Sequence, residues 1–242
     1  MVKCCHHRSR NLNVALKGQA ISIRKDQGMA DLNCECGACG FDLNFTKPQL
    51  SLFCGCKDCR QALEWGATKG GKNPSALPEL IYMRSDISAI TGKSFMKAFQ
   101  LRQNAKSTRL YCVLCFSIIG VDYPGYRDNV FMFFKNHCRT SCDLSQSPAA
   151  AIYLNDLPDL SKAEVPIDVP VFHSFRFQQE QSRFRKVNGI TDTFKKPASV
   201  PAGQSLRDII KTLGPVEILN LQQGKSFADS TRQCNLINVS LV

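Results

Sequence analysis

The sequence has no long apolar run. Strongly apolar stretches such as Val130–Phe134 are far shorter than the roughly 20 residues that a transmembrane helix needs. The first thirty residues also contain no apolar segment of the kind that forms the core of a secretory signal. We therefore expect no membrane span and an intracellular, cytoplasmic chain whose cysteines are kept reduced.

Acidic residues are missing before Asp26, and residues 1–30 carry six basic side chains against that single acidic one. This composition is typical of a mitochondrial or plastid transit peptide, and equally of a disordered basic arm. Both interpretations stay open for residues 1–30. Targeting to an organelle is therefore an alternative to the cytoplasm.

Basic residues outnumber acidic ones over the whole chain, which has a formal net charge of +11. This excess favours an acidic partner: a nucleic acid, an anionic surface or a small anionic substrate. The segment Phe175–Lys186 mixes aromatic with basic residues, as protein surfaces that bind single-stranded nucleic acid do. A helix with a buried Phe edge and a solvated basic face fits the same pattern, and this is the interpretation that we favour.

Internal repeats are scarce, and one short pattern, CxCxxC, occurs twice, at Cys34–Cys39 and Cys54–Cys59. A CxxC pair follows at Cys112–Cys115. Zinc binds thiolate sulfur at about 2.3 Å in tetrahedral sites, so its sulfur ligands lie within roughly 4 Å of one another. Short spacings bring the sulfurs together at little cost in loop-closure entropy. The clusters predict cysteine ligation of two zinc ions.

The eight cysteines of these clusters permit two arrangements. In one, Cys39 serves as a ligand, two four-cysteine sites form and both ions are structural. In the other, Cys54, Cys56 and Cys59 hold an ion whose fourth position is open, as in catalytic zinc sites. Three thiolates give a zinc unit a net negative charge, which favours uptake of a thiol over generation of hydroxide from water. The open arrangement therefore predicts thiol chemistry.

Turn signals such as Tyr123-Pro-Gly-Tyr126 separate short segments of β-type composition. We predict a mainly β domain over residues 31–178, built as a short-stranded sheet with cysteine knuckles. Residues 179–242 are predicted to form a small basic extension with a short helix over Ser205–Leu213. The segment Gln178–Val187 is helix-compatible, and Asn235–Val242 is weakly strand-like. The predicted strands are Phe41–Thr46, Leu50–Phe53, Glu79–Arg84, Phe95–Arg102, Thr108–Tyr111, Ser117–Asp122, Val130–Phe134, Ala151–Leu154 and Val169–Phe175.

The order of the cysteine motifs resembles the GFA family, which comprises the glutathione-dependent formaldehyde-activating enzymes and their relative, centromere protein V. The resemblance covers roughly residues 33–177. The chain departs from the family pattern at Gly55, where His is common, and at Phe116, where Gly is usual. The matching segments are Cys34-Glu-Cys36-Gly37, Cys54-Gly-Cys56-Lys-Asp58-Cys59-Arg60 and Tyr111-Cys112-Val-Leu-Cys115.

The resemblance implies a β-sheet zinc fold in which Cys34, Cys36, Cys112 and Cys115 hold a structural zinc ion. It also implies a second zinc ion at Cys54, Cys56 and Cys59, near which glutathione takes up formaldehyde in a carbon–sulfur lyase reaction. Asp58 and Arg60 flank Cys59 and are candidates for contacts with glutathione or another small thiol. The alternative, closer to centromere protein V, is a non-catalytic zinc module whose basic segments bind nucleic acid, chromatin or cytoskeleton.

Overall fold

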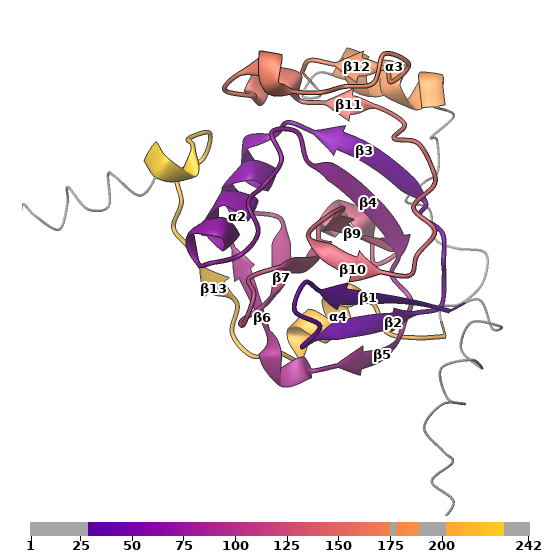
Figure 1. Cartoon of the computed structure of the whole chain (residues 1–242), viewed down its shortest axis with the longest axis vertical. Coiled ribbons are helices and arrows are strands. Elements are labelled where there is room, and N and C mark those ends of the chain that lie inside the picture. The colour runs from indigo at the N-terminus through magenta and orange to yellow at the C-terminus, as the bar shows by residue number, and fades with distance from the viewer. Residues whose placement is uncertain (1–28, 175–177, 189–201, 230–242) are drawn as a thin grey trace, which may run out of the picture.

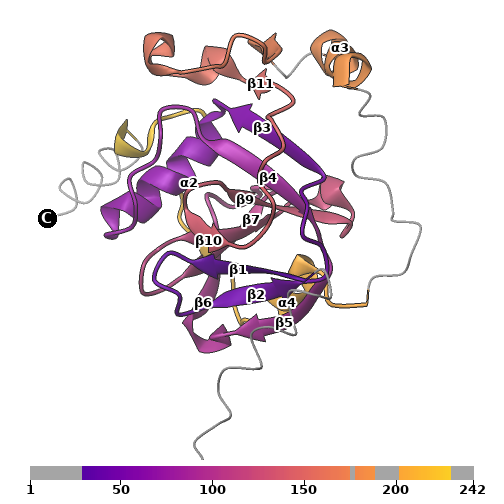
Figure 2. The ribbon, with the colours of Figure 1, turned by 45° about the vertical axis from the view of Figure 1, so that its right-hand side comes forward.

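The computed structural model describes residues 29–174, 178–188 and 202–229. Its smaller sheet has four antiparallel strands in the order β10-β1-β2-β5 and lies in the lower half of Figure 2. These strands are β1 (Ala30–Cys34), β2 (Gly40–Leu43), β5 (Ile87–Thr91) and β10 (Cys138–Thr140).

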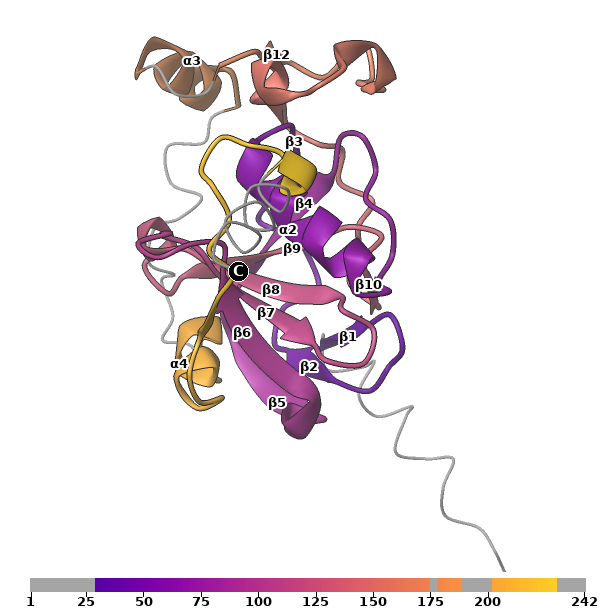
Figure 3. The same ribbon diagram turned by 90° about the vertical axis from the view of Figure 1, so that its left-hand side faces the viewer.

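The larger sheet has nine strands in the order β12-β11-β3-β4-β9-β8-β7-β6-β13. Its central ladders are antiparallel, and Figure 3 shows β8, β7 and β6 side by side. The ladders β12-β11, β11-β3 and β6-β13 are parallel. The strands are β3 (Leu50–Cys54), β4 (Glu79–Arg84), β6 (Met96–Gln100), β7 (Thr108–Cys112), β8 (Ile118–Asp122), β9 (Val130–Phe134), β11 (Ala151–Ile152), β12 (Val171–Phe172) and β13 (Glu217–Ile218).

The labelled α-helices are α2 (Lys57–Thr68), α3 (Gln178–Asn188) and α4 (Leu206–Lys211), and residues 227–229 are also helical. Figure 1 shows α3 beside β12, at the β11 end of the molecule. None of the helices that the structure describes has the length and apolarity to cross a membrane. Short 3₁₀ turns occupy Lys93–Phe95, Pro124–Tyr126, Leu154–Asp156 and Leu160–Lys162.

The two faces of the larger sheet bury separate cores, because successive side chains of a strand point to opposite faces. The face toward α2 carries the helix-side core, and the face toward the smaller sheet and α4 carries the sheet-side core. The helix-side core includes Cys54, Cys59, Leu63, Trp65, Leu80, Tyr82, Phe99, Tyr111 and Met132. The sheet-side core includes Leu32, Cys34, Cys39, Phe41, Ile81, Met83, Leu110, Cys112, Phe131, Leu206 and Ile209.

Residues 202–229 pack into both cores. Leu206 and Ile209 of α4 are fully buried in the sheet-side core, and Leu206 lies so close to Gly120 that a Cβ at that glycine would be 2.9 Å from its Cδ2. Further along, the amide of Leu221 donates to the carbonyl oxygen of Leu101 at 2.7 Å, which places Leu221 in the helix-side core. This C-terminal segment therefore braces both faces of the larger sheet.

The mainly β prediction is confirmed, and β4 and β9 have the predicted bounds. The helix predicted at Ser205–Leu213 is confirmed as α4, with the Ser205 side chain accepting from the amide of Asp208 as its N-cap. The helix at Gln178–Val187 is confirmed as α3. Residues 1–28 and the predicted strand Asn235–Val242 lie outside the described residues. The family's specific zinc fold stays a prediction.

The sequence interpretation was wrong about the segment after Cys56, where it predicted only a knuckle between strands. The structure has the helix α2 there, with Cys56 as its N-cap and Asp58 in its first turn. Its buried residues recur with the helical period: Cys59, Ala62, Leu63, Trp65 and Gly66. The strands β1, β5, β10 and β13 were also missed.

The aromatic and basic residues of α3 support the interpretation of a helix with a buried Phe edge. Phe184 is buried, with its ring 5.5 Å from that of Phe172, and the guanidinium of Arg183 lies 5.1 Å from the Phe172 ring centroid. The ring of Phe184 is therefore covered by protein and does not offer a stacking surface. Phe175 and Phe177 lie outside the described residues.

Candidate metal centres

The structure brings seven of the predicted ligands into two groups, which lie on opposite faces of the larger sheet. In each group all sulfur atoms lie within 4.8 Å of one another, close to the spacing of thiolates around a tetrahedral ion. The four-cysteine group is Cys34, Cys36, Cys112 and Cys115, and the three-cysteine group is Cys54, Cys56 and Cys59. Thiolate donor sets of this kind suit zinc, although the identity of the metal stays a prediction.

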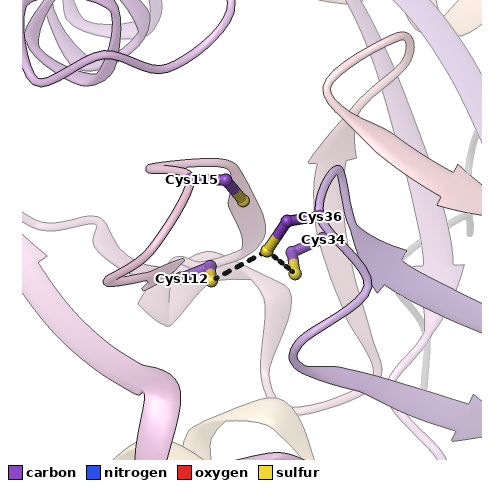
Figure 4. Close-up of side chains that lie close together, drawn as sticks. All are labelled: Cys34, Cys36, Cys112 and Cys115. Atoms are coloured by element: carbon purple, nitrogen blue, oxygen red, sulfur yellow. Dashed lines mark hydrogen bonds between the residues drawn. The ribbon is translucent and has the colours of Figure 1, made fainter.

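The four-cysteine group joins the loop after β1 to the turn after β7. Figure 4 shows two cysteines on each of these segments, with their sulfurs facing one another. The Sγ of Cys36 lies 3.5 Å from that of Cys34 and 3.8 Å from that of Cys112. Four converging thiols complete a tetrahedron, so this group has the geometry of a structural site.

Left-handed residues shape both segments of the four-cysteine group. Gly37 has a φ of +77°, which lets the chain turn back so that its amide donates to the carbonyl oxygen of Cys34 at 3.0 Å. Phe116 has a φ of +53°, and its amide donates to the carbonyl oxygen of Cys112 at 2.9 Å. A positive φ is uncommon for a residue with a side chain, so Phe116 makes this turn at some cost in backbone strain.

Ser117 links the two segments, a role that sequence reasoning missed. Its hydroxyl oxygen accepts from the amide of Glu35 at 3.1 Å and lies 3.2 Å from the Sγ of Cys115. Burial raises the pKa of Cys115, but hydrogen bonds from Ser117 and Cys36 outweigh it and bring the pKa to about 6. The position of Ser117, two residues after the CxxC pair, was the sequence signal that could have indicated this role.

The three-cysteine group is built where β3 runs into α2. Cys54 ends β3, Cys56 is the N-cap of α2 and Cys59 lies in the first helical turn. The Sγ of Cys56 accepts from the amide of Cys59 at 3.4 Å, so the positive end of the helix dipole faces the sulfurs. Between them, Gly55 packs tightly, because a Cβ there would lie 2.7 Å from the carbonyl oxygen of Tyr153. That contact leaves no room for a side chain at position 55.

The three-cysteine group is mostly enclosed. Cys54 and Cys59 are 2% and 7% exposed, whereas Cys56 is half-buried and is the least covered residue of the three. Hydrogen bonds from the thiols of Cys54 and Cys59 lower the pKa of Cys56, and the same contact with Cys56 raises the pKa of Cys54. Cys56 is therefore the first of the three to become a thiolate.

Within the described part of the chain, no fourth His, Cys, Asp or Glu joins the three-cysteine group. Cys39, the predicted fourth ligand, belongs to neither group. It is fully buried in the sheet-side core beside Cys34, whose Sγ accepts from the Cys39 amide at 3.4 Å. The described residues therefore form the arrangement with three thiols in the second group, and not the arrangement in which Cys39 completes it.

Asp58 and Arg60 flank Cys59 as the sequence requires, and both are engaged within the protein. The Asp58 carboxylate is paired with Arg102, with Oδ1 at 2.6 Å from Nη2. Nη2 of Arg60 donates a hydrogen bond to the carbonyl oxygen of Asp156. These contacts give both residues a part in holding the start of α2. Direct contact with a substrate stays a prediction.

Three further residues near the three-cysteine group were not found from the sequence. Arg109 of β7 is 3% exposed and donates to the carbonyl oxygen of Asp58 at 3.4 Å. Tyr82 and Tyr126 pack edge to face with ring centroids 5.7 Å apart, in the helix-side core that contains Cys54. They come from three separate segments, so no sequence spacing relates them to the cysteines.

Comparison with known proteins adds no assignment to this geometry. No family model matches the chain, and no curated protein or solved structure matches it either. The GFA resemblance therefore stays a prediction, and the site must be interpreted from its own residues.

Proposed function

We propose that the protein is a zinc-dependent carbon–sulfur lyase that forms and cleaves S-hydroxymethylglutathione, the adduct of glutathione and formaldehyde. One observation carries the proposal: three thiols converge at the start of α2, and no fourth ligand joins them among the described residues. A site with three protein ligands can take up an exogenous one. The four-cysteine group, by contrast, is complete.

The charge of the three-cysteine group supports a thiol as the visiting ligand. A zinc ion bound there would hold an incoming sulfur as a thiolate and so make it a better nucleophile. Cys56 is the least buried of the three cysteines, and this supports an approach of the visiting sulfur from the Cys56 side. Lys57, which follows Cys56, makes no ion pair with any described residue, and the proposal gives it the role of a contact to a carboxylate of glutathione.

The reaction balances without a co-reactant. In the forming direction, the glutathione sulfur adds to the carbonyl carbon, the S–C bond forms and the π-electron pair of the carbonyl moves to its oxygen. The thiol loses one proton and the oxygen takes up one proton. The reverse direction breaks the same S–C bond, which is a lyase reaction. Holding both reactants at one site supplies the effective concentration that favours addition.

Tyr82 and Tyr126 are the groups to which this proposal gives the role of donors to the carbonyl oxygen. Burial raises the pKa of both phenols, and charge on Cys54 and Cys59 raises them further, so each keeps its proton at neutral pH. The same charge effect indicates that both phenols lie close to the three-cysteine group. The two phenols are hydrogen-bonded to each other, and a protonated phenol can donate to an oxygen that develops negative charge.

The test is exchange of carbon-13 formaldehyde with its glutathione adduct, followed by nuclear magnetic resonance on the zinc-loaded full chain. We expect the protein to accelerate exchange above the spontaneous rate, and Cys56→Ser to abolish the acceleration while the four-cysteine group keeps its metal. Cys39→Ala is the matched control and should retain the rate, because Cys39 belongs to neither group. A chain that holds two metals, binds no thiol and does not accelerate exchange would be the non-catalytic zinc module.

A further inference from the structure

Arg109 is a buried guanidinium without a carboxylate of its own. It is 3% exposed, and its Nε has no hydrogen-bond partner. Its other nitrogens make long hydrogen bonds of 3.4 Å to the carbonyl oxygens of Ser107 and Asp58. Arg109 forms no ion pair with an acidic group of the described residues. The carboxylate of Asp58 is paired with Arg102 instead. A buried cation in this state is strongly destabilising unless another negative charge faces it.

The three-cysteine group supplies that negative charge. Burial lowers the pKa of Arg109, and negative charge on Cys59, Asp58 and Cys56 opposes this shift, so the arginine lies within electrostatic reach of two of the sulfurs. Alternation along β7 gives the same placement: Arg109 and Tyr111 point to the helix-side core, while Leu110 and Cys112 point to the sheet-side core. Strand β7 thus brings a cation to one candidate centre and a ligand to the other.

A charge count shows what this cation does. Three neutral thiols would leave Arg109 only the charge of Asp58, which is already paired with Arg102, whereas three thiolates on a dication leave one further negative charge for Arg109 to balance. The N-terminus of α2 adds about half a positive charge at the same place. Together they compensate an anionic fourth ligand but give no such advantage to a neutral one.

We propose that Arg109 is the permanent counter-charge of the three-cysteine group, and that it makes the fourth position selective for an anionic ligand such as a thiolate over a neutral ligand such as imidazole. This inference rests on the proposed function, because it requires a metal with an open position at Cys54, Cys56 and Cys59. Arg109 acts through the charge of the site and is a positioning and selectivity residue.

The experiment titrates glutathione and imidazole into the cobalt(II)-substituted full chain and follows the visible absorption of the metal. The variants are Arg109→Met, which keeps an apolar stem beside Phe99, and Arg109→Lys, which keeps the charge. Arg139→Gln, an exposed arginine on β10, is the matched control. We expect Arg109→Met to weaken glutathione binding about 10- to 100-fold and to change imidazole binding less than about threefold. Arg109→Lys and the control should stay within about fivefold of the original chain.

A second measurement covers the case in which Arg109→Met does not fold. In Arg109→Lys the preference for glutathione over imidazole should fall as the pH approaches about 10, where a lysine loses its charge, while the original chain keeps its preference. Equal losses of glutathione and imidazole binding in Arg109→Met, or a pH-independent preference in Arg109→Lys, would overturn the inference. The failure of the proposed function has another signature: the original chain itself would bind no exogenous thiol.

Discussion

Arg102 and Asp58 form a two-point ion pair at the start of α2. Nη2 of Arg102 lies 2.6 Å from Oδ1 of Asp58, and Nη1 lies 3.3 Å from Oδ2. The same guanidinium donates to the side-chain oxygen of Gln61 at 3.1 Å and to the carbonyl oxygen of Leu221 at 3.2 Å. One side chain thus joins the helix turn that carries Cys59 to the C-terminal segment.

Breaking this pair should loosen the helix start without unfolding the protein. We expect Asp58→Asn to lower the free energy of unfolding by about 1 kcal/mol, because Asp58 is half exposed and Arg102 keeps its other acceptors. Urea denaturation measures the change, and a double-mutant cycle with Arg102→Met isolates the interaction. Strictly additive effects of the two substitutions would show that the pair contributes nothing.

Metal content should distinguish Cys39 from its neighbours. We expect the purified chain and Cys39→Ala to hold two zinc ions each, because Cys39 belongs to neither group of ligands. Cys112→Ser should lose the ion of the four-cysteine group and much of the stability of the sheet-side core. Elemental analysis with thiol titration gives the counts. Loss of one zinc ion in Cys39→Ala would mean that Cys39 is a ligand after all.

Gly55 should not tolerate a side chain. A Cβ at this position would lie 2.7 Å from the carbonyl oxygen of Tyr153 and 3.0 Å from Cγ of Leu157, so Gly55→Ala should cost about 1–3 kcal/mol of unfolding free energy. It should also weaken metal binding by the three-cysteine group more than by the four-cysteine group. Adding Leu157→Ala should restore only part of the loss, because the backbone oxygen of Tyr153 cannot be removed. Full recovery would contradict this explanation.

His137 should make the protein less stable in mild acid. Burial lowers the pKa of His137, and the charge of Lys72 lowers it further against the opposing effect of Glu35. The unfolded chain therefore takes up a proton near pH 6.5 while the folded chain does not, and the unfolding free energy falls as the pH drops below that value. The loss is at most about 1.4 kcal/mol per pH unit.

The measurement compares His137→Asn with the original chain at about pH 7.5 and about pH 5.5, in excess zinc. We expect the variant to lose less stability between the two pH values. Protonation of the cysteine ligands destabilises both proteins alike, so the difference between them isolates the histidine. Equal losses in both proteins would show that His137 is not the group that titrates.

The sequence predicted the parts of the fold in which local chemistry is decisive. Strands β4 and β9 are rich in β-branched and aromatic residues, and Ser205 caps α4 through its own hydroxyl. Helix α2 was missed because Gly66 and three closely spaced cysteines are poor helix signals, and its stability comes from packing Leu63 and Trp65 into the helix-side core. The short strands β5 and β10 depend in the same way on their partners.

The spacing of the cysteines by itself determined that this chain can gather thiols for soft metals, because ligands two or three residues apart need little chain closure to meet. Only the tertiary structure decided which cysteines belong to which metal-binding group. Residues 76 positions apart, Cys36 and Cys112, come within 3.8 Å, whereas Cys39, three residues from Cys36, turns into the core. The alternation of β7 then places Cys112 on one face of the sheet and Arg109 on the other. Such pairings follow from the register and packing of distant strands, which no local spacing encodes.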